Sequence, residues 1–425
     1  MIERRGHCAR LAAAGLAVAA LGAGCEAEPS DLGLLPSGTS GPDGGAGQGG
    51  QAGAGGADAG PSEAGADAAP DAQEDAAPDA APPPSFSFVV FGDNQFATES
   101  CTSGVPERLA VPEVVRSLSP TFVLSVGDLM DHGYDDGAYA KLVSCYEGML
   151  AELPFFPTSG NHDMAKGGIW KYKAYLEEQL GTRNPSVWPG DFAGDFAVAY
   201  EDDPTEYSTD FDKPTHLDDV PSGVSFKTFY AVRFQNAYFI SFEQGTRWWT
   251  NTPRSWVEKH LKAARSAPGI EHVFVTMHHP MYSVKMEETD PSECVKPVRQ
   301  AYEALVRDYD VTAVFSGHVH LYERFYVPDD GSPTKSDSPP SIYPHDGHAV
   351  HYVTTGGGGG PLPNNCSPIP APLKQYSFQY LQARRCGYHV TRVQVEGKKL
   401  TLSVIGVTGN ASDHTTELWD EIVVQ

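Results

Sequence analysis

From Ser85 onward, short apolar runs alternate with longer amphipathic stretches. The apolar runs are rich in Val and Phe, are typical of strands, and cover residues 88–91, 122–126, 154–157, 224–234, 237–242, 273–276 and 311–315. The amphipathic stretches predict helices over residues 107–118, 138–150, 170–180, 253–265 and 298–308. The alternation predicts α/β layers. The end of the chain is mostly strand (350–354, 388–395 and 400–407) and predicts a second sheet in a mixed sandwich.

Residues 1–25 have the features of a signal peptide. Three arginines in the first ten residues precede an apolar stretch of small side chains over 11–24. The stretch ends in Leu-Gly-Ala-Gly before Cys25, which resembles the cleavage and lipidation box of bacterial lipoproteins. We expect an exported protein, either periplasmic or at the cell surface, with a membrane tether through a lipidated Cys25. Ordinary signal cleavage and secretion is the alternative.

Residues 26–84 consist mainly of Gly, Ala, Pro and Asp and contain no Lys or Arg. Such a segment has few large apolar side chains to offset the entropy lost on ordering, so it predicts a disordered linker. The linker would hold a single domain, residues 85–425, away from a membrane surface.

Charge and hydropathy exclude two classes of protein. The chain has 55 Asp and Glu against 30 Lys and Arg, for a net charge of −25. Nucleic-acid backbones are bound by clustered Lys and Arg, so no nucleic-acid-binding surface is predicted. No apolar run reaches the roughly 18 residues of a membrane-spanning helix, so an integral membrane protein is not predicted either.

The cysteines of residues 85–425 predict disulfides rather than a zinc site. They are Cys101, Cys145, Cys294, Cys366 and Cys386. They lack the close paired spacing of a zinc ribbon, and exported proteins form disulfides in an oxidising compartment. We expect the pairs Cys101–Cys145 and Cys366–Cys386 with Cys294 free, although the spacing leaves other pairings open.

Five predicted strands run directly into clusters of Asp, Asn and His. The clusters are Gly92-Asp93-Asn94-Gln95, Gly127-Asp128, Gly160-Asn161-His162-Asp163, His278-His279 and Gly317-His318-Val319-His320. Sites in α/β sheets form at the carboxyl ends of strands, so the clusters are expected to converge. Their side chains are common ligands of divalent metals. One cluster alone would be an ordinary turn or helix cap, but five in succession predict a metal site.

The order of these clusters resembles the motif series of the calcineurin-like metallophosphoesterases: Asp-x-His, Gly-Asp, Gly-Asn-His-Asp/Glu, His and Gly-His-x-His. Residues Met277–Tyr282 and Gly317–Arg324 look like the purple acid phosphatase branch. The resemblance extends from Phe88 to the C-terminus. It implies an α/β fold, a four-layer α/β/β/α sandwich of two mixed β-sheets flanked by helices.

The resemblance also implies a centre of two metal ions, of Fe, Zn or Mn. The ligands would be Asp93, Asp128, Asn161, His278, His318 and His320. Asp128 would bridge the ions, Asp93 and His320 would complete the first site, and the other three ligands the second. The centre would generate a hydroxide that attacks the phosphorus of a small-molecule phosphate ester. His162 would be catalytic, stabilising the transition state or protonating the leaving group.

Two positions depart from the family pattern. Purple acid phosphatases have an iron-binding tyrosine three residues after the second-motif Asp, where this chain has Asp131. We therefore expect no coloured ferric centre. Gln95 replaces the usual first-motif histidine, and an amide is a poorer ligand than an imidazole. Gln95 is left out of the ligand set, and the first metal is expected to bind weakly.

Two further segments resemble ligand sites, but neither is predicted to bind a nucleotide or an additional metal. The run Gly356–Gly360 lacks the Lys-Ser/Thr ending of a nucleotide-binding loop, and the resemblance implies a backbone role beside the metals. His345, His348 and His351 lie in a segment rich in Pro and Asp and are expected to be surface histidines rather than a second metal cluster.

The sequence therefore predicts an exported, acid phosphatase-like enzyme that hydrolyses phosphomonoesters. A phosphodiesterase acting on nucleotides or phospholipid headgroups is the alternative, because the same site performs both reactions. A non-catalytic surface module that binds phosphate or a partner protein is a third interpretation. The presence of His162 beside all six ligands argues against that third interpretation.

Overall fold

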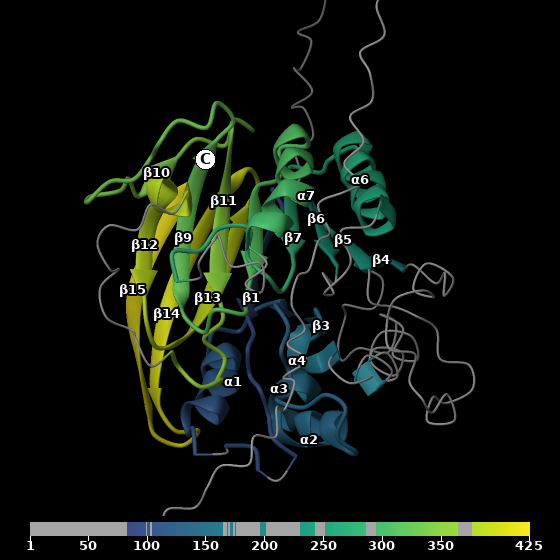
Figure 1. The fold of residues 1–425 in the computed structure, drawn as a ribbon, viewed down its shortest axis with the longest axis vertical. Helices are drawn as coiled ribbons and strands as arrows, with labels where there is room; N and C mark the ends of the chain where they lie inside the picture. Colours follow the sequence, from purple (N-terminus) through teal and green to yellow (C-terminus); the bar gives the residue numbers. More distant parts are fainter. Residues whose placement is uncertain are drawn as a thin grey trace, which may run out of the picture. The chain divides into compact units, whose positions relative to one another are not determined.

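The computed structural model describes residues 83–98, 100–102, 104–164, 168, 171–172, 175, 196–200, 230–242, 251–285, 295–363 and 376–425. The predicted signal peptide and all but the last two residues of the predicted linker lie outside these residues. Within them, strands form two mixed sheets, with helices on the outer faces (Figure 1). No helix in the described ranges is long and apolar enough to cross a bilayer.

The first sheet has seven strands in the order β10-β15-β14-β13-β1-β2-β3. The strands are β1 (Ser85–Phe91), β2 (Phe122–Ser125), β3 (Phe155–Pro157), β10 (Ile342–Tyr343), β13 (Tyr388–Glu396), β14 (Lys399–Gly409) and β15 (His414–Val424). β1, β2 and β3 are parallel, so their carboxyl ends lie at one edge. β13, β14 and β15 continue the sheet as antiparallel neighbours.

The second sheet has eight strands in the order β12-β9-β11-β8-β7-β6-β5-β4. They are β4 (Phe196–Tyr200), β5 (Tyr230–Phe234), β6 (Ala237–Ser241), β7 (His272–Thr276), β8 (Ala313–Ser316), β9 (Tyr322–Pro328), β11 (Ala349–Thr355) and β12 (Leu381–Arg385). β6, β7, β8 and β11 run parallel, so this sheet also brings several strand ends to one edge.

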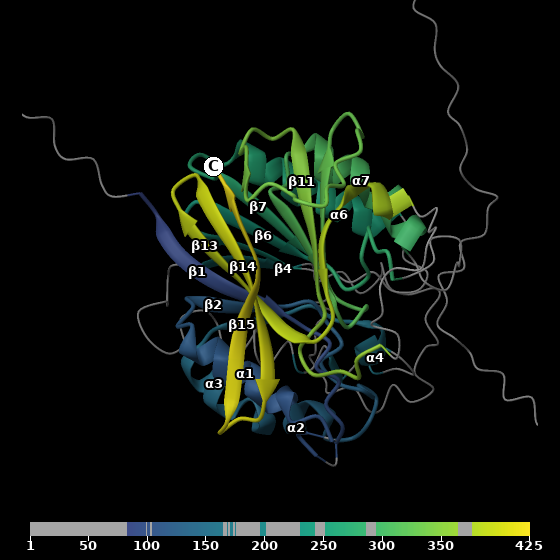
Figure 2. The same cartoon turned by 90° about the vertical axis from the view of Figure 1, so that its left-hand side faces the viewer.

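Helices cover the outer faces of both sheets (Figure 2). The helices of the described residues are α1 (Glu107–Ser117), α2 (Ala138–Cys145), α3 (Glu147–Glu152), α4 (Asn161–Met164), α6 (Asn251–Ser266), α7 (Val295–Asp308) and the 3-10 helix η7 (Tyr376–Tyr380), and the short α4 lies at the candidate site rather than on a sheet face. α1 packs on β13, β14 and β15, whereas α6 packs on β6 and α7 on β11. The predicted four-layer α/β/β/α sandwich is confirmed.

Phenylalanine rings fill the space between the two sheets. Phe88 of β1 contacts Phe239 of β6 and Phe274 of β7, each with its ring centroid 5.1 Å away. Phe122 of β2 contacts Phe239 with centroids 5.2 Å apart. These edge-to-face contacts are favourable beyond the apolar area that they bury. They hold β1 and β2 opposite β6 and β7.

One predicted helix differs from the structure, and several strands, among them β9 and β15, were not predicted. The helix expected over 138–150 is broken at Tyr146, whose φ of −105° and ψ of 14° lie outside the helical region. Tyr146 is buried, and its neighbour Cys145 is disulfide-bonded, so tertiary contacts override the helical pattern there. The long strand β15 was missed because polar residues interrupt its apolar positions: six of its eleven residues are polar or charged, and two are buried. The helix expected over 170–180 lies largely outside the described residues.

The predicted disulfide Cys101–Cys145 is confirmed, with Cα atoms 5.5 Å apart. It joins the segment after β1 to the end of α2. Cys386 is also disulfide-bonded, but Cys366 and Cys294 lie outside the described residues, so the pair Cys366–Cys386 stays a prediction.

A buried ion pair joins the two sheets beyond the phenylalanine core. Arg324 of β9 has its Nε 2.7 Å from Oδ2 of Asp420 in β15, and the Arg324 side chain is 1% exposed. Tyr322 donates its hydroxyl to the same carboxylate oxygen over 2.6 Å. A buried charge without its partner is costly, so this network fixes β9 against β15.

Replacing Asp420 with alanine should leave the buried Arg324 guanidinium without its carboxylate. We expect the free energy of unfolding to fall by about 3–5 kcal/mol, measured by urea denaturation. Asp337→Ala is the control, because Asp337 is fully exposed and pairs with Lys335 at the surface. Equal losses of stability in the two variants would show that the buried pair does not hold the sheets together.

Candidate metal centre

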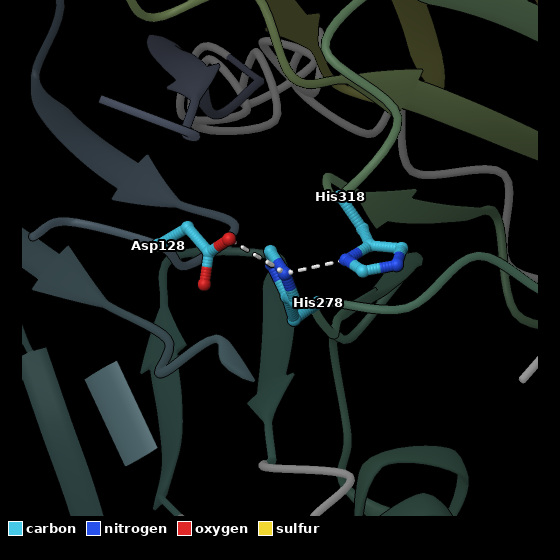
Figure 3. Close-up of side chains that lie close together, drawn as sticks. All are labelled: Asp128, His278 and His318. Atoms are coloured by element: carbon cyan, nitrogen blue, oxygen red, sulfur yellow. Dashed lines mark hydrogen bonds and ion pairs between the residues drawn. The ribbon is translucent and has the colours of Figure 1, made fainter. Parts of the chain in front are cut away.

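The polar clusters converge where strands of the two sheets end. Asp93 follows β1 and Asp128 follows β2 in the first sheet, while His278 follows β7 and His318 follows β8 in the second. Figure 3 shows Asp128, His278 and His318 pointing toward one another. Side chains from both sheets therefore line one site.

Two overlapping sets of side chains in the described residues could hold metal ions. One set is Asp128, His278 and His318, and the other is Asp93, Asp128 and His320. Within each set, one ligand atom of each residue lies within 4.8 Å of the others. Asp128 belongs to both sets, which is the position that a bridging carboxylate requires.

His278 lies at the centre of the first of these sets. Its Nε2 is 3.3 Å from Oδ2 of Asp128, 3.2 Å from Nδ1 of His318 and 3.0 Å from Oδ1 of Asn161. Its Nδ1 lies 2.8 Å from the carbonyl oxygen of Val126 and donates to it. Nε2 therefore faces the other candidate ligands and is the ring nitrogen that a metal would take in place of a proton.

His320 and Asp93 form the other end of the site. His320 Nε2 is 3.3 Å from Oδ1 of Asp93, and His320 Nδ1 is 2.7 Å from the carbonyl oxygen of Pro361. Asp93 Oδ1 also accepts the His318 N–H over 2.8 Å. Asp93 Oδ2 is buried and has no hydrogen-bond partner among the described residues. A bound cation would satisfy this oxygen.

The backbone around the site is held in an unfavourable conformation. Asp93, Asp128, His318 and His320 have φ values of 58°, 53°, 69° and 50°. Residues other than glycine rarely adopt this left-handed backbone conformation. Such a conformation persists only where the surrounding contacts enforce it. The glycine of the third motif is needed for a different reason, since a Cβ at Gly160 would lie 2.1 Å from Oδ1 of Asp128.

The electrostatics of the site favour positive charge. Burial alone would lower the pKa of His278, but Asp128 outweighs it and raises the pKa to about 9. Burial likewise opposes protonation of His320, and Asp93 raises its pKa to about 9. Burial would raise the pKa of Asp128, yet the imidazoles around it hold that pKa well below the usual range. Buried carboxylates that attract protons onto histidines attract metal cations for the same reason.

His162 lies beside Asp128 but in neither metal-binding set. Its backbone N–H donates to Oδ1 of Asp128 over 2.9 Å, and its Nε2 is 4.0 Å from Oδ2. Its Nδ1 is 2.7 Å from the carbonyl oxygen of Asp131 and 3.4 Å from Oδ1 of the same residue. Asp131 therefore fixes the ring with Nε2 toward the site. The His162 side chain is 36% exposed, so solvent and substrate can reach it.

Gln95 donates its Nε2–H to Oδ2 of Asp128 over 3.3 Å. The Gln95 amide, in the loop after β1, thus helps to hold the Asp128 carboxylate in place. It belongs to neither of the two metal-binding sets.

Asp163, the last residue of the third motif, is a structural member of the site that the sequence analysis left without a role. It accepts the backbone N–H groups of Leu129, Met130 and Gly160 over 3.2, 3.2 and 2.9 Å. Burial and the charge of Asp128 raise its pKa to about 7. Asp163 joins the loop after β2 to the loop after β3. The Tyr139 hydroxyl also donates to its Oδ1 over 3.1 Å. Its position in the motif was the only signal, because three of these four partners are backbone N–H groups.

The expectation of three surface histidines was wrong for His351. His348 is exposed and His345 is partly exposed. His351 is 3% exposed and packs against Tyr326 and Tyr343 between the sheets. It is the third residue of β11, and its side chain takes the inward position of that strand. None of the three belongs to the two metal-binding sets.

Comparisons with known proteins agree with this geometry. The profile of the family described as Calcineurin-like phosphoesterase matches residues 86–322. The chain is 26% identical over 178 residues to the Fe(3+)-Zn(2+) purple acid phosphatase 12 of Arabidopsis thaliana, covering 41% of this chain and 36% of that protein. It is 26% identical over 227 residues to a purple acid phosphatase of Glycine max, covering 50% and 45%. The chain therefore spans less than half the length of these curated relatives.

Solved structures show the same fold. The purple acid phosphatase PPD1 from yellow lupin (Lupinus luteus) seeds superposes with a TM-score of 0.54 at 17% identity, covering 81% of this chain and 54% of that chain. A structure described as PhoD superposes with a TM-score of 0.53 at 10% identity, covering 82% and 71%. The family match includes more than half of this chain and all five polar clusters. The chain belongs to the calcineurin-like phosphoesterase family, and within it the chain is similar to the purple acid phosphatases.

Proposed function

We propose that this protein is a metal-dependent phosphatase that hydrolyses phosphomonoesters at a centre of two metal ions. The observation that carries the proposal is the pair of overlapping ligand sets that share Asp128. A shared carboxylate lowers the repulsion between two neighbouring cations. The family match and the purple acid phosphatase relatives support the same activity.

The residues fit a pair of metal ions. Asp93, Asp128 and His320 would hold one ion, and Asp128, Asn161, His278 and His318 would hold the other. The free Oδ2 of Asp93 and the carboxylates that raise the histidine pKa values support cation binding at both places. The mixed oxygen and nitrogen donors suit Fe, Zn or Mn.

Bound there, the ions would supply Lewis-acid activation of water and of the phosphoryl group. The protein's own proton chemistry would come from His162. Its Nδ1–H donates to the Asp131 carbonyl oxygen, so its Nε2 faces the space beside Asp128. When Nε2 also carries a proton, so that the ring is an imidazolium, it can donate a hydrogen bond to a phosphoryl oxygen or give that proton to the leaving oxygen and return to the neutral ring.

A small-molecule phosphomonoester is the proposed substrate because the curated relatives named above are described as phosphatases. A phosphodiesterase acting on nucleotides or phospholipid headgroups is the second candidate, since the same ligand sets serve both reactions. A non-catalytic binding module would not require His162 to be held with its Nε2 toward Asp128. The orientation of His162 therefore supports an enzyme over a binding module.

The proposal includes the location of the enzyme. Residues 1–25 would direct export, Cys25 would carry a lipid anchor, and residues 26–84 would be a flexible spacer for the catalytic domain 85–425. This organisation rests on the sequence features alone. It would place the phosphatase in the periplasm or at the cell surface, where phosphate esters outside the cytoplasm are its substrates.

Metal depletion tests the proposed activity directly. After chelation the protein should hydrolyse neither an aryl phosphomonoester nor the matching diester, and Mn²⁺, Zn²⁺ or iron should restore turnover. Faster restored turnover of the monoester would support a phosphatase, and faster turnover of the diester would favour the second candidate. A folded protein inactive with every metal would contradict the enzyme and favour a binding module.

Asp128→Asn tests the shared ligand. An amide cannot bridge two cations as a carboxylate does, so kcat/KM should fall by more than about 100-fold. Asp337→Asn is the matched control, because it makes the same chemical change at an exposed surface position. Circular dichroism should show that both variants fold. Wild-type turnover in folded Asp128→Asn would remove Asp128 from the mechanism.

The absorption spectrum tests whether the replacement of the iron-binding tyrosine by Asp131 removes the colour of the metal centre. Because a carboxylate stands where purple acid phosphatases have their iron-binding tyrosine, the iron-loaded protein should have no visible tyrosinate-to-iron charge-transfer band. Metal analysis of the same sample should establish that iron is bound. A visible band of this kind would show that another tyrosine reaches the metal.

A further inference from the structure

A run of five glycines, Gly356–Gly360 (the glycine strap), passes directly over the ligands Asp93 and His320. The Gly358 N–H donates to the carbonyl oxygen of Gly92 over 2.8 Å, and the Gly360 N–H donates to that of Asp93 over 2.6 Å. The next residue, Pro361, accepts the hydrogen bond from His320 Nδ1 over 2.7 Å. The strap thus fixes the backbone at Asp93 and the ring of His320.

Close packing explains why the strap consists of glycine. A Cβ at Gly356 would lie 2.7 Å from Oδ2 of Asp93, and one at Gly360 would lie 2.9 Å from Cε1 of His320. Glycine removes these clashes but adds conformational freedom. Since the strap has no side chains of its own, its position depends on groups from other segments.

Arg108, on helix α1, is such a group. Its Nε donates to the carbonyl oxygen of Gly359 over 3.1 Å, and its Nη1 donates to that of Thr102 over 2.9 Å. Arg108 is 3% exposed. Thr102 follows Cys101, which the disulfide to Cys145 fastens to the end of α2. The guanidinium therefore connects the strap to a covalently fixed part of the fold.

We propose that Arg108 is a positioning residue for the metal ion bound by Asp93, Asp128 and His320. This inference rests on the proposed function. Asp93 and His320 both have left-handed backbones, with φ of 58° and 50°, and such residues relax when the contacts around them are removed. Without the Arg108 donors the strap would loosen, and the two ligands would have to be ordered again when the metal binds.

Of the two candidate metal sites, the one formed by Asp93, Asp128 and His320 should lose more metal affinity when its support is removed, because it has fewer imidazole ligands. Its single imidazole is His320, because Gln95 stands where the family has a second one. The other site has two imidazoles and an amide oxygen, and its central residue His278 is fixed by the Val126 carbonyl rather than by the strap. Loss of Arg108 should therefore weaken one metal site and spare the other.

Arg108→Met tests this, because methionine keeps an apolar stem and removes all the guanidinium donors. Metal equivalents and their dissociation constants for Zn²⁺ or Mn²⁺ would be measured on the full chain by chelator competition and elemental analysis. Wild type should bind two equivalents. Arg108→Met should bind one of them about 10–100-fold more weakly and the other unchanged. Arg116→Met, on the surface of the same helix, should match wild type.

Combining Arg108→Met with His320→Ala shows which of the two metal sites Arg108 supports. In His320→Ala protein, Arg108→Met should change the affinity of the remaining equivalent by less than about twofold, because the site that Arg108 supports has already lost its imidazole and the remaining ligands do not contact the strap. If Arg108→Met does not fold, Arg108→Lys, which retains one donor group, should show the same selective weakening to a smaller extent.

The outcomes separate this inference from the proposed function. Two unchanged equivalents in Arg108→Met, equal weakening of both, or the full effect in the His320→Ala background would overturn the role of Arg108 alone. A wild-type protein that binds no metal would overturn the proposed function and this inference with it.

Discussion

The buried carboxylate of Asp128 is the constraint on which the arrangement of the site depends. It is 1% exposed, and a charge at such depth must be paired or coordinated. Its partners come from different parts of the chain: His278 from the second sheet, and Gln95 and the His162 N–H from loops of the first. The strand ends of both sheets must therefore meet at this carboxylate.

The fold meets this requirement through packing away from the site. Phenylalanine rings hold β1 and β2 against β6 and β7, and the Arg324–Asp420 pair holds β9 to β15. With the sheets fixed, the loops after the strands can keep left-handed conformations at Asp93 and Asp128. Stability built in the core thus compensates for strain at the site, as is common where function requires an unfavourable backbone.

The two candidate metal positions differ in how they are supported. His278 has a direct carbonyl partner close to the end of β2. Asp93 and His320 depend instead on the glycine strap, which Arg108 holds together with Asn94 and the His389 N–H. Gln95 supports Asp128 instead of adding an imidazole. One candidate position is therefore supported directly and the other through a chain of backbone contacts, and this difference is the physical basis for the proposed weaker binding of the first metal.

The chain's own sequence determined the strands that carry the motifs, because those strands are buried on both faces and appear as continuous apolar runs. It also determined the order of the Asp, Asn and His clusters, from which the convergence at strand ends was predictable. Tertiary structure alone decided the break of the predicted helix at Tyr146, the exposed strand β15, the burial of His351 and the roles of Asp163 and Arg108. Asp163 and Arg108 bond mainly to backbone N–H and carbonyl groups, which nearly every residue carries, so no side-chain pattern can reveal which ones lie within reach. That choice is made only when distant segments pack together.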